Sequence, residues 1–72
     1  MSVEKLKEIL EMLRYYNAVE ITHTFKNGEN PLLSVCCLKN TSTFQITILD
    51  SKTVKYFECV EEAAKTIEKL IH

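Results

Sequence analysis

Three cysteines and one of the two histidines are the residues of this chain whose chemistry could go beyond packing. Cys36, Cys37 and Cys59 supply thiols, and His23 supplies a base. Nucleophilic catalysis by a thiol needs a base within hydrogen-bond reach and a third group that orients the base. The candidate pairs are His23 with Cys37 and His23 with Cys59. A partly buried, hydrogen-bonded histidine is the commoner role of such a residue, so we expect no catalytic residue and a protein that is not an enzyme.

The same residues do not form a metal-ligating motif. Zinc sites use pairs of cysteine or histidine ligands at short, fixed spacings. Cys36 and Cys37 are adjacent, and neighbouring side chains on a strand point to opposite faces. They are therefore not expected to bond to each other, and an odd number of cysteines is a poor disulfide framework. The sequence predicts no metal, no cofactor and a cytoplasmic location.

Length and composition predict one globular domain over residues 1–72. Of the 72 residues, 46% are apolar and 26% are charged. No apolar run approaches the ~20 residues needed to span a bilayer, so no membrane partner is expected. Nine basic and ten acidic residues give a net charge of −1, which does not favour a protein that neutralises phosphates. Such a short chain hides only roughly 60% of its unfolded surface, and dimerisation is a common way to bury more.

The central pattern is the stretch 32–49, which predicts two antiparallel strands joined by a polar turn at residues 39–42. Apolar and polar residues alternate on both sides of this turn, which is the mark of strands with one buried face. A turn of even length sets the register. The register puts six side chains on one face, pairing Cys37 with Phe44, Val35 with Ile46 and Leu33 with Ile48.

A strand over Val19–Phe25 is predicted before this pair, from its alternation and its β-branched residues. Asn27-Gly28 is a strong turn signal. We expect a loop of three or five residues with Gly28 in a left-handed bulge position, because a two-residue loop would turn Ile21 toward the wrong face. Pro31 cannot donate to a ladder, so the next strand is expected to start after it.

A short fourth strand is predicted at Val54–Phe57, after a polar turn at residues 50–53. The phase of this strand is ambiguous, because alternate residues of either set have a claim on the core. We favour Phe57 inward and Tyr56 outward.

Two amphipathic helices are predicted at the ends of the chain, at Met1–Tyr16 and Val60–Ile71, from apolar residues at three- and four-residue spacing. Ser2 is a plausible N-cap of the first helix. Together the elements predict an α+β domain of order α-β-β-β-β-α, in which an antiparallel meander of three to four strands packs against both helices in two layers. Its expected inner face consists of Val19, Ile21, Leu33, Val35, Phe44, Ile46, Ile48 and Phe57.

The opposite face of the predicted sheet is more apolar than a fully wet face requires. Scattered apolar residues on a surface are normal, but a patch on a face that no helix covers also suits self-association or a protein partner. We interpret it as the interaction surface of a homodimer, and an edge strand is a further place where a partner could add a strand. The residues predicted to form the interaction site are Cys36, Leu38, Gln45, Thr47, Leu49 and Tyr56.

Nucleic-acid binding is the alternative function. The order helix, three strands, helix is also that of a double-stranded-RNA-binding domain, which places basic residues at the start of its second helix. Here that position reads Val-Glu-Glu-Ala-Ala over residues 60–64, which is acidic. Arg14 with Tyr15 and Tyr16 offers a cation with stacking rings, but Tyr16 belongs to the predicted core stripe. A nucleic-acid partner is therefore not favoured.

A further pattern extends over most of the chain and consists of Phe25, Gly28, Ser34, Val35, Thr43, Phe44, Ile46, Tyr56, Phe57, Ala64, Ile67, Leu70 and Ile71, with Leu6, Ile9, Leu10 and Leu13 of the first helix. In these residues the chain resembles the YkuJ-like proteins, small uncharacterised proteins of Gram-positive bacteria. The resemblance implies the same order of elements in a bacterial protein, and it brings neither a known activity nor catalytic residues. The chain departs from that family before the last helix, where the family tends to have aspartates and this chain has Glu58, Cys59 and Glu61.

Overall fold

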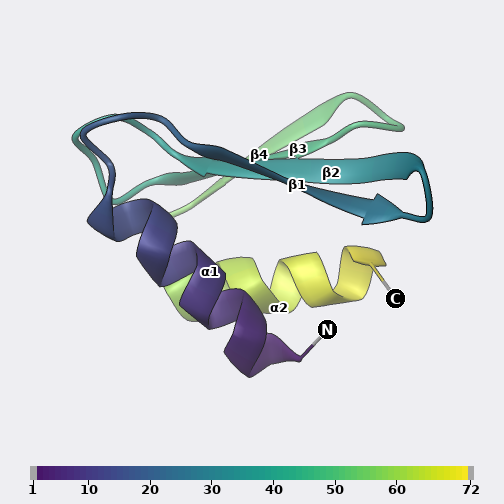
Figure 1. Ribbon diagram of the computed structural model, residues 1–72, viewed down its shortest axis with the longest axis horizontal. Coiled ribbons are helices and arrows are strands. Elements are labelled where there is room, and N and C mark those ends of the chain that lie inside the picture. The colour runs from purple at the N-terminus through teal and green to yellow at the C-terminus, as the bar shows by residue number, and fades with distance from the viewer. Residues whose placement is uncertain (1, 72) are drawn as a thin grey trace.

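The computed structural model describes residues 2–71, apart from the side chain of Asn27. The four strands form one antiparallel sheet in the order β1-β2-β3-β4, and both helices lie on one side of it (Figure 1). The predicted two-layer α+β fold is confirmed. Its elements are α1 (Val3–Tyr15), β1 (Thr22–Asn27), β2 (Asn30–Cys37), β3 (Phe44–Ile48), β4 (Thr53–Phe57) and α2 (Val60–Ile71).

Helix α1 begins directly after Ser2, the predicted N-cap. The Oγ of Ser2 accepts a hydrogen bond from the backbone N–H of Lys5 at 3.2 Å, which satisfies one of the first-turn donors that lack a helical partner. The helix ends at Tyr15, one residue earlier than predicted, and its predicted start at Met1 lies outside the described residues. Its buried stripe consists of Leu6, Leu10 and Leu13.

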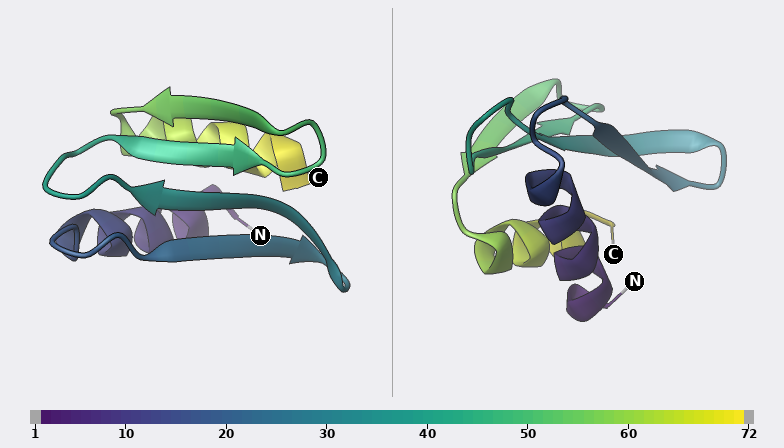
Figure 2. Two further views of the ribbon diagram at one scale, coloured as in Figure 1. Left: turned by 90° about the horizontal axis from the view of Figure 1, so that it is seen from above. Right: turned by 60° about the vertical axis from the view of Figure 1, so that its left-hand side comes forward.

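Helix α2 has the predicted bounds. Glu61 and Lys65 form an ion pair at 3.3 Å across one turn of its exposed side. The helices lie side by side beneath the sheet, α1 on the β1–β2 side and α2 on the β3–β4 side (Figure 2). Neither of these two helices, within residues 2–71, is long and apolar enough to cross a membrane. The side chains that α2 buries are Val60, Ala63, Ala64 and Ile67.

The central strands pair in the predicted register, Leu33 with Ile48, Val35 with Ile46 and Cys37 with Phe44. All of these side chains except that of Ile48, which is half-buried, belong to the core. The loop between β2 and β3 turns at Asn40, whose φ is 58°. Asparagine enters this left-handed region more readily than most residues, so the turn residue suits the turn.

Strand β1 begins at Thr22 instead of the predicted Val19. Its neighbour β2 ends at Cys37, which the register would place opposite Ile21, so residues 19 and 20 have no strand opposite them and Ile21 lies beside the last residue of β2 without pairing to it. Val19 and Ile21 were predicted to line the core, but they are 61% and 42% exposed. The alternation over residues 19–25 indicates β-propensity, whereas the pairing begins only at Thr22.

The turn between β1 and β2 is also shorter than predicted. Asn27 pairs with Asn30, so the loop has two residues, Gly28 and Glu29, with Gly28 at φ +66°. β2 therefore starts before Pro31 and not after it. A glycine at this position enters the left-handed region without the steric cost of a Cβ.

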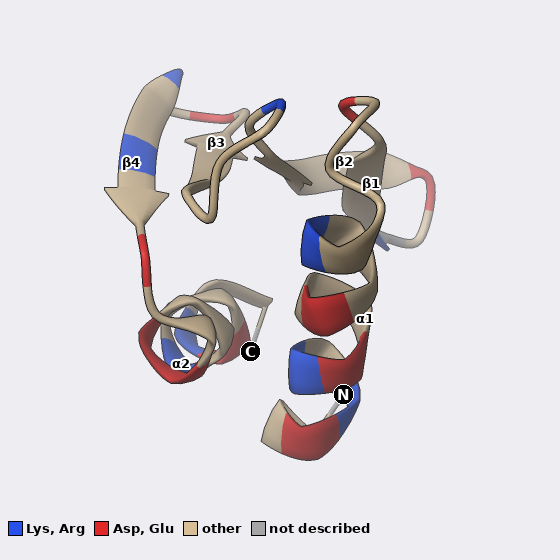
Figure 3. Ribbon diagram, turned by 90° about the vertical axis from the view of Figure 1, so that its left-hand side faces the viewer, with Lys and Arg blue, Asp and Glu red and all other residues tan. Residues whose placement is uncertain are grey.

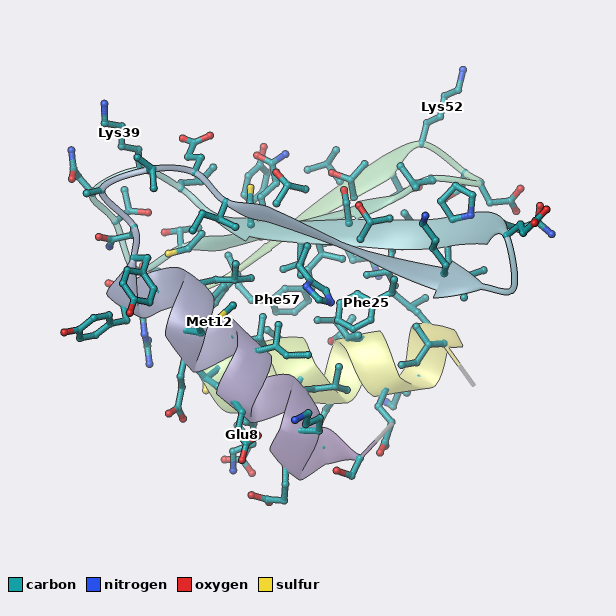
Figure 4. All side chains as sticks on the ribbon, viewed as in Figure 1. Glu8, Met12, Phe25, Lys39, Lys52 and Phe57 are labelled. Atoms are coloured by element: carbon teal, nitrogen blue, oxygen red, sulfur yellow. The ribbon has the colours of Figure 1, made fainter. Side chains whose placement is uncertain are left out.

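A β-bulge within the hairpin shifts the pairing of the two strands by one residue. The shift offsets the register that the two-residue turn alone would set, and so changes which residues of β2 face those of β1. The register shifts between Phe25 and Lys26, which leaves Leu32 without a partner on β1. Phe25 then pairs with Leu33 and points into the layer between sheet and helices (Figure 4). The extra residue predicted for the loop thus lies in the strand, as a β-bulge.

Strand β4 is an edge of the sheet and is mostly exposed. Phe57 pairs with Phe44 on the core side, and Tyr56 lies on the opposite side, as predicted. Lys55 pairs with Ile46 and therefore lies on the core side as well, although it is exposed.

Candidate interaction surface

The face of the sheet turned away from the helices is not covered by any other part of the described chain (Figure 1). We call it the outer face. Because side chains alternate along a strand, the register assigns to it two rows of four residues that cross all four strands, and the alternation adds Lys26 of β1 and Leu32 of β2 toward the turn between these strands. One row is Thr22, Cys36, Gln45 and Tyr56, and the other is Thr24, Ser34, Thr47 and Val54.

The structure brings four of the six predicted interaction residues together in these rows, namely Cys36, Gln45, Thr47 and Tyr56. The other two lie just beyond the strands. Leu38 follows β2 at one end of the sheet, and Leu49 follows β3 at the other. Val54 belongs to the face but was not among the predicted residues. The phase of β4 is the signal that identifies Val54. Side chains alternate along the strand, so if Phe57 faces the core, Tyr56 and Val54 both lie on the outer face.

Neither row of the outer face contains a charged residue, although 26% of the chain is charged. Strands β2 and β3 carry no charge on either face, and the charges lie on the helices, at the turns and on the two edge strands, such as Lys55 on β4 (Figure 3). Lys39 and Lys52 stand at opposite ends of the sheet on the side away from the helices (Figure 4). The outer face is thus an uncharged strip with charges at its ends.

The face is not level across its four strands. On β4, Tyr56 is 59% exposed and Val54 is 43% exposed. The side chains on β2 and β3 are half-buried, and the edge strand β1 contributes two exposed threonines. The bulk on this face is therefore concentrated along one edge.

The thiols of β2 lie on opposite faces of the sheet, as predicted for adjacent residues. Cys37 is buried and its Sγ donates to the Thr41 carbonyl at 3.2 Å, whereas Cys36 is half-buried on the outer face. Burial raises the pKa of the Cys36 thiol, and the charges of Glu20 and Cys37 raise it further. Burial also raises the pKa of Cys37, against a smaller opposing effect of Arg14. A raised pKa reduces the thiolate fraction, and the thiolate is the reactive form.

The structure does not form either of the Cys–His pairs considered as catalytic candidates. His23 pairs with Val35 on the core side and contacts the ring of Phe25 at 4.7 Å between centroids. The Cys37 thiol donates to a carbonyl instead. Cys59 follows β4, the strand at the opposite edge of the sheet from His23.

A second exposed apolar region lies at the end of α1 and in the connection to β1. We call it the aromatic corner: Met12, Tyr15, Tyr16, Val19 and Ile21. The rings of Tyr15 and Tyr16 meet edge to face at 4.8 Å. Tyr16 was predicted to belong to the core stripe, but it is 53% exposed and Tyr15 is 79% exposed. The reason is that α1 ends at Tyr15, so the helical phase that would bury Tyr16 is not continued.

Hydrogen bonds hold the aromatic corner against the loop between β2 and β3. The Asn17 Nδ2 donates to the Thr41 carbonyl at 2.6 Å, and the Asn40 N–H donates to the Asn17 carbonyl at 2.9 Å. The Lys39 N–H donates to the Glu20 carboxylate at 3.0 Å. These bonds replace the strand pairing that residues 19–21 lack. The sequence alone gave no signal for them.

Over residues 2–71 the structure contains neither a group of three or more metal-ligating side chains nor a pocket. The structure thus defines a class, a two-layer α+β meander domain with an uncovered sheet face on which two rows of residues carry no charge. Comparisons with protein-family models, curated proteins and solved structures found no match to this chain. The resemblance to YkuJ-like proteins stays a prediction.

Proposed function

We propose that this protein is a small, non-enzymatic interaction protein of the cytoplasm that acts as a homodimer through its outer face. The observation that carries the proposal is the absence of charge in the two rows that cross the sheet. A sheet face that remains in water is normally polar, and exposed positions favour charged residues. The centre of a protein interface is instead depleted of charge.

The dimensions of the face suit a second copy of the chain. The chain extends 30 Å and 18 Å along the two principal axes in which the sheet lies, so the projected area of the face is at most about 540 Å² per copy. Two such faces together come close to the roughly 1,000 Å² expected of a specific interface. A chain of this length also gains most from added burial, because its own core is small.

The thiols support a role other than catalysis. The pKa values of Cys36 and Cys37 are raised, which is opposite to the shift that activates a cysteine nucleophile. The half-buried Cys36 is at the same time suited to an interface, because cysteine behaves as a small hydrophobic residue.

The test is the solution mass of the wild type and of Leu38→Lys, measured by light scattering over a dilution series. We expect a wild-type dimer that the lysine dissociates, because it places a charge beside the covered face. Tyr15→Lys is the matched control, since it adds the same charge at the aromatic corner and leaves the dimer intact. A wild type that is monomeric at every concentration contradicts the proposal.

A second candidate function, binding of single-stranded nucleic acid, rests on the aromatic corner. The exposed rings of Tyr15 and Tyr16 offer stacking surfaces for bases. The Arg14 guanidinium, however, lies over the Phe44 ring at 5.7 Å and not beside these tyrosines as a free cation. Fluorescence anisotropy with a labelled oligonucleotide at low salt tests this candidate. Binding that weakens steeply with salt and disappears in Tyr15→Ala would support it, and no binding at low salt would exclude it.

A further inference from the structure

The uneven outer face determines how a second copy fits on it; this inference rests on the proposed homodimer. Bulk rises along one edge, where Tyr56 and Val54 stand on β4. The opposite edge is low along the two rows, where β1 contributes Thr22 and Thr24, and Lys26 lies beyond them toward the turn. A partner surface must therefore be low over β4 and high over β1.

Two stacked sheets related by twofold symmetry have their axis in the plane between them. If the axis runs across the strands, β4 faces the partner's β4 and β1 faces the partner's β1. The bulky side chains of the two β4 strands then face each other at one edge of the interface, and the threonines of the two β1 strands face each other across a gap at the other edge. If the axis runs along the strands, β4 faces the partner's β1 at both edges, and each high edge enters a low one. Protein interfaces are packed as closely as protein interiors, which favours the second arrangement.

We propose that two copies stack with the twofold axis along the strands, so that β4 of each copy covers β1 of the other. In this arrangement each row lies on the reversed row of the partner. Tyr56 then faces the partner's Thr22, and Cys36 faces the partner's Gln45. In the second row Val54 faces the partner's Thr24, and Ser34 faces the partner's Thr47.

The rotation between the sheets does not remove these contacts. Aligned sheets cross at about 30°, and an edge strand lies about 7 Å from the middle of a four-stranded sheet. The rotation therefore shifts facing residues at the edges by about one residue. The side chains of tyrosine, lysine and glutamate span such a shift.

A charge swap between the two edges tests the arrangement. We expect Tyr56→Glu alone and Thr22→Lys alone to raise the dimer dissociation constant at least 30-fold. The combined variant Thr22→Lys/Tyr56→Glu should return to within about tenfold of wild type, because each lysine then faces a glutamate of the other copy. Both positions are exposed in one chain and lie on opposite edges of the sheet, so the rescue cannot arise within a copy.

Crosslinking gives a second readout that does not depend on the charged variants folding. Facing sheets lie ~10 Å apart, beyond the reach of a disulfide, so a short bismaleimide is the suitable reagent. In a background with Cys36→Ser and Cys59→Ser, we expect Tyr56→Cys to crosslink with Thr22→Cys and neither variant to crosslink with itself.

The outcomes separate the arrangement from the dimer itself. A wild-type dimer in which Tyr56→Cys crosslinks with itself, or in which the charge swap gives no rescue, overturns the arrangement and leaves the homodimer standing. A monomeric wild type overturns both. Rescue together with the mixed crosslink confirms the arrangement.

Discussion

The outer face and the aromatic corner both expose apolar side chains to water, but they are built in opposite ways. The outer face collects side chains from four strands that are far apart in the sequence, and its middle consists of half-buried residues. The corner comes from residues 12–21 alone, and its side chains stand further out, with Tyr15 at 79% exposed.

Charge separates the two regions further. Arg14 and Glu20 alternate with the apolar residues of the corner, whereas the rows of the outer face contain no charge at all. A face with uncharged rows can match a copy of itself under twofold symmetry. A protruding corner with mixed charge fits a self-complementary contact less well. The difference favours the sheet face for the proposed self-association, which would leave the corner accessible.

The largest expected difference between the outer face and the aromatic corner is in how the dimer responds to one charge added to each region. Gln45→Glu changes little in shape but places a carboxylate in the middle of the outer face. We expect it to raise the dimer dissociation constant at least 100-fold, equivalent to about 2.7 kcal/mol, because the charge loses water without gaining a partner. Tyr15→Glu should change the constant less than threefold. Sedimentation velocity measures both, and equal effects would remove the distinction between the regions.

The second prediction concerns the hydrogen bonds that hold the corner. Asn17→Ala removes the side-chain donor to the Thr41 carbonyl, and we expect it to lower the free energy of unfolding by about 1 kcal/mol. Ser42→Ala in the adjoining exposed loop is the control, with a change below about 0.5 kcal/mol. Urea denaturation in the Gln45→Glu background keeps dimerisation out of the measurement. An Asn17→Ala effect no larger than that of the control would show that the bond contributes nothing.

The third prediction uses the native thiols as reporters of covered surface. Cys36 lies on the outer face, and Cys59 is exposed outside it. Alkylation of Cys36 by iodoacetamide should slow severalfold as protein concentration rises and dimers form, while the rate at Cys59 stays constant. Mass spectrometry resolves the two sites. A concentration-independent rate at Cys36 would show that the second copy does not cover it.

The smallest effect is expected from pH. The raised pKa of Cys36 means that the folded chain holds this proton more tightly than the unfolded chain, whose thiol has the ordinary value of 9.0. The resulting stabilisation is fully present below pH 9.0 and is lost as pH rises through the higher folded-state value. Cys36→Ser should therefore weaken the fall in stability above pH 9, measured by urea denaturation at several pH values. An unchanged pH profile would argue against burial of this thiol.

The parts of the fold that were predicted correctly are those in which the hydrophobic alternation of a strand is matched by a neighbouring strand that pairs with it. Two alternating strands and an even turn leave only one register that puts Cys37 and Phe44 on the same face, and the structure has that register. Alternation alone left two phases of β4 open, and the favoured phase, with Phe57 inward and Tyr56 outward, is the one that the structure has. Four of the predicted interaction residues lie in the two rows for the same reason.

The errors lie where the hydrophobic pattern of the sequence continues beyond the end of the helix or strand in which those residues would be buried. Val19 and Tyr16 have the types and spacing of core residues, but β2 and α1 end before they can be buried, and Ile21 precedes the first paired residue of β1. The bulge at Leu32 corrects parity inside the strand, although the turn signal at Gly28 pointed to the loop. Chain ends and bulges depend on tertiary contacts such as the Asn17–Thr41 hydrogen bond, which periodicity does not report.

Lys55 has a consequence for the size of the assemblies this protein can form. It places a charge on the core side of an edge strand, and inward-pointing charges on edge strands oppose the addition of a further strand. Growth of the sheet from β4 into a continuous ribbon is therefore disfavoured. Stacking in the proposed homodimer would offer no second route, because it would use the one sheet face that the helices leave free. Lys55 thus protects the sheet at this edge against growth into fibres, and the proposed dimer would be a closed pair.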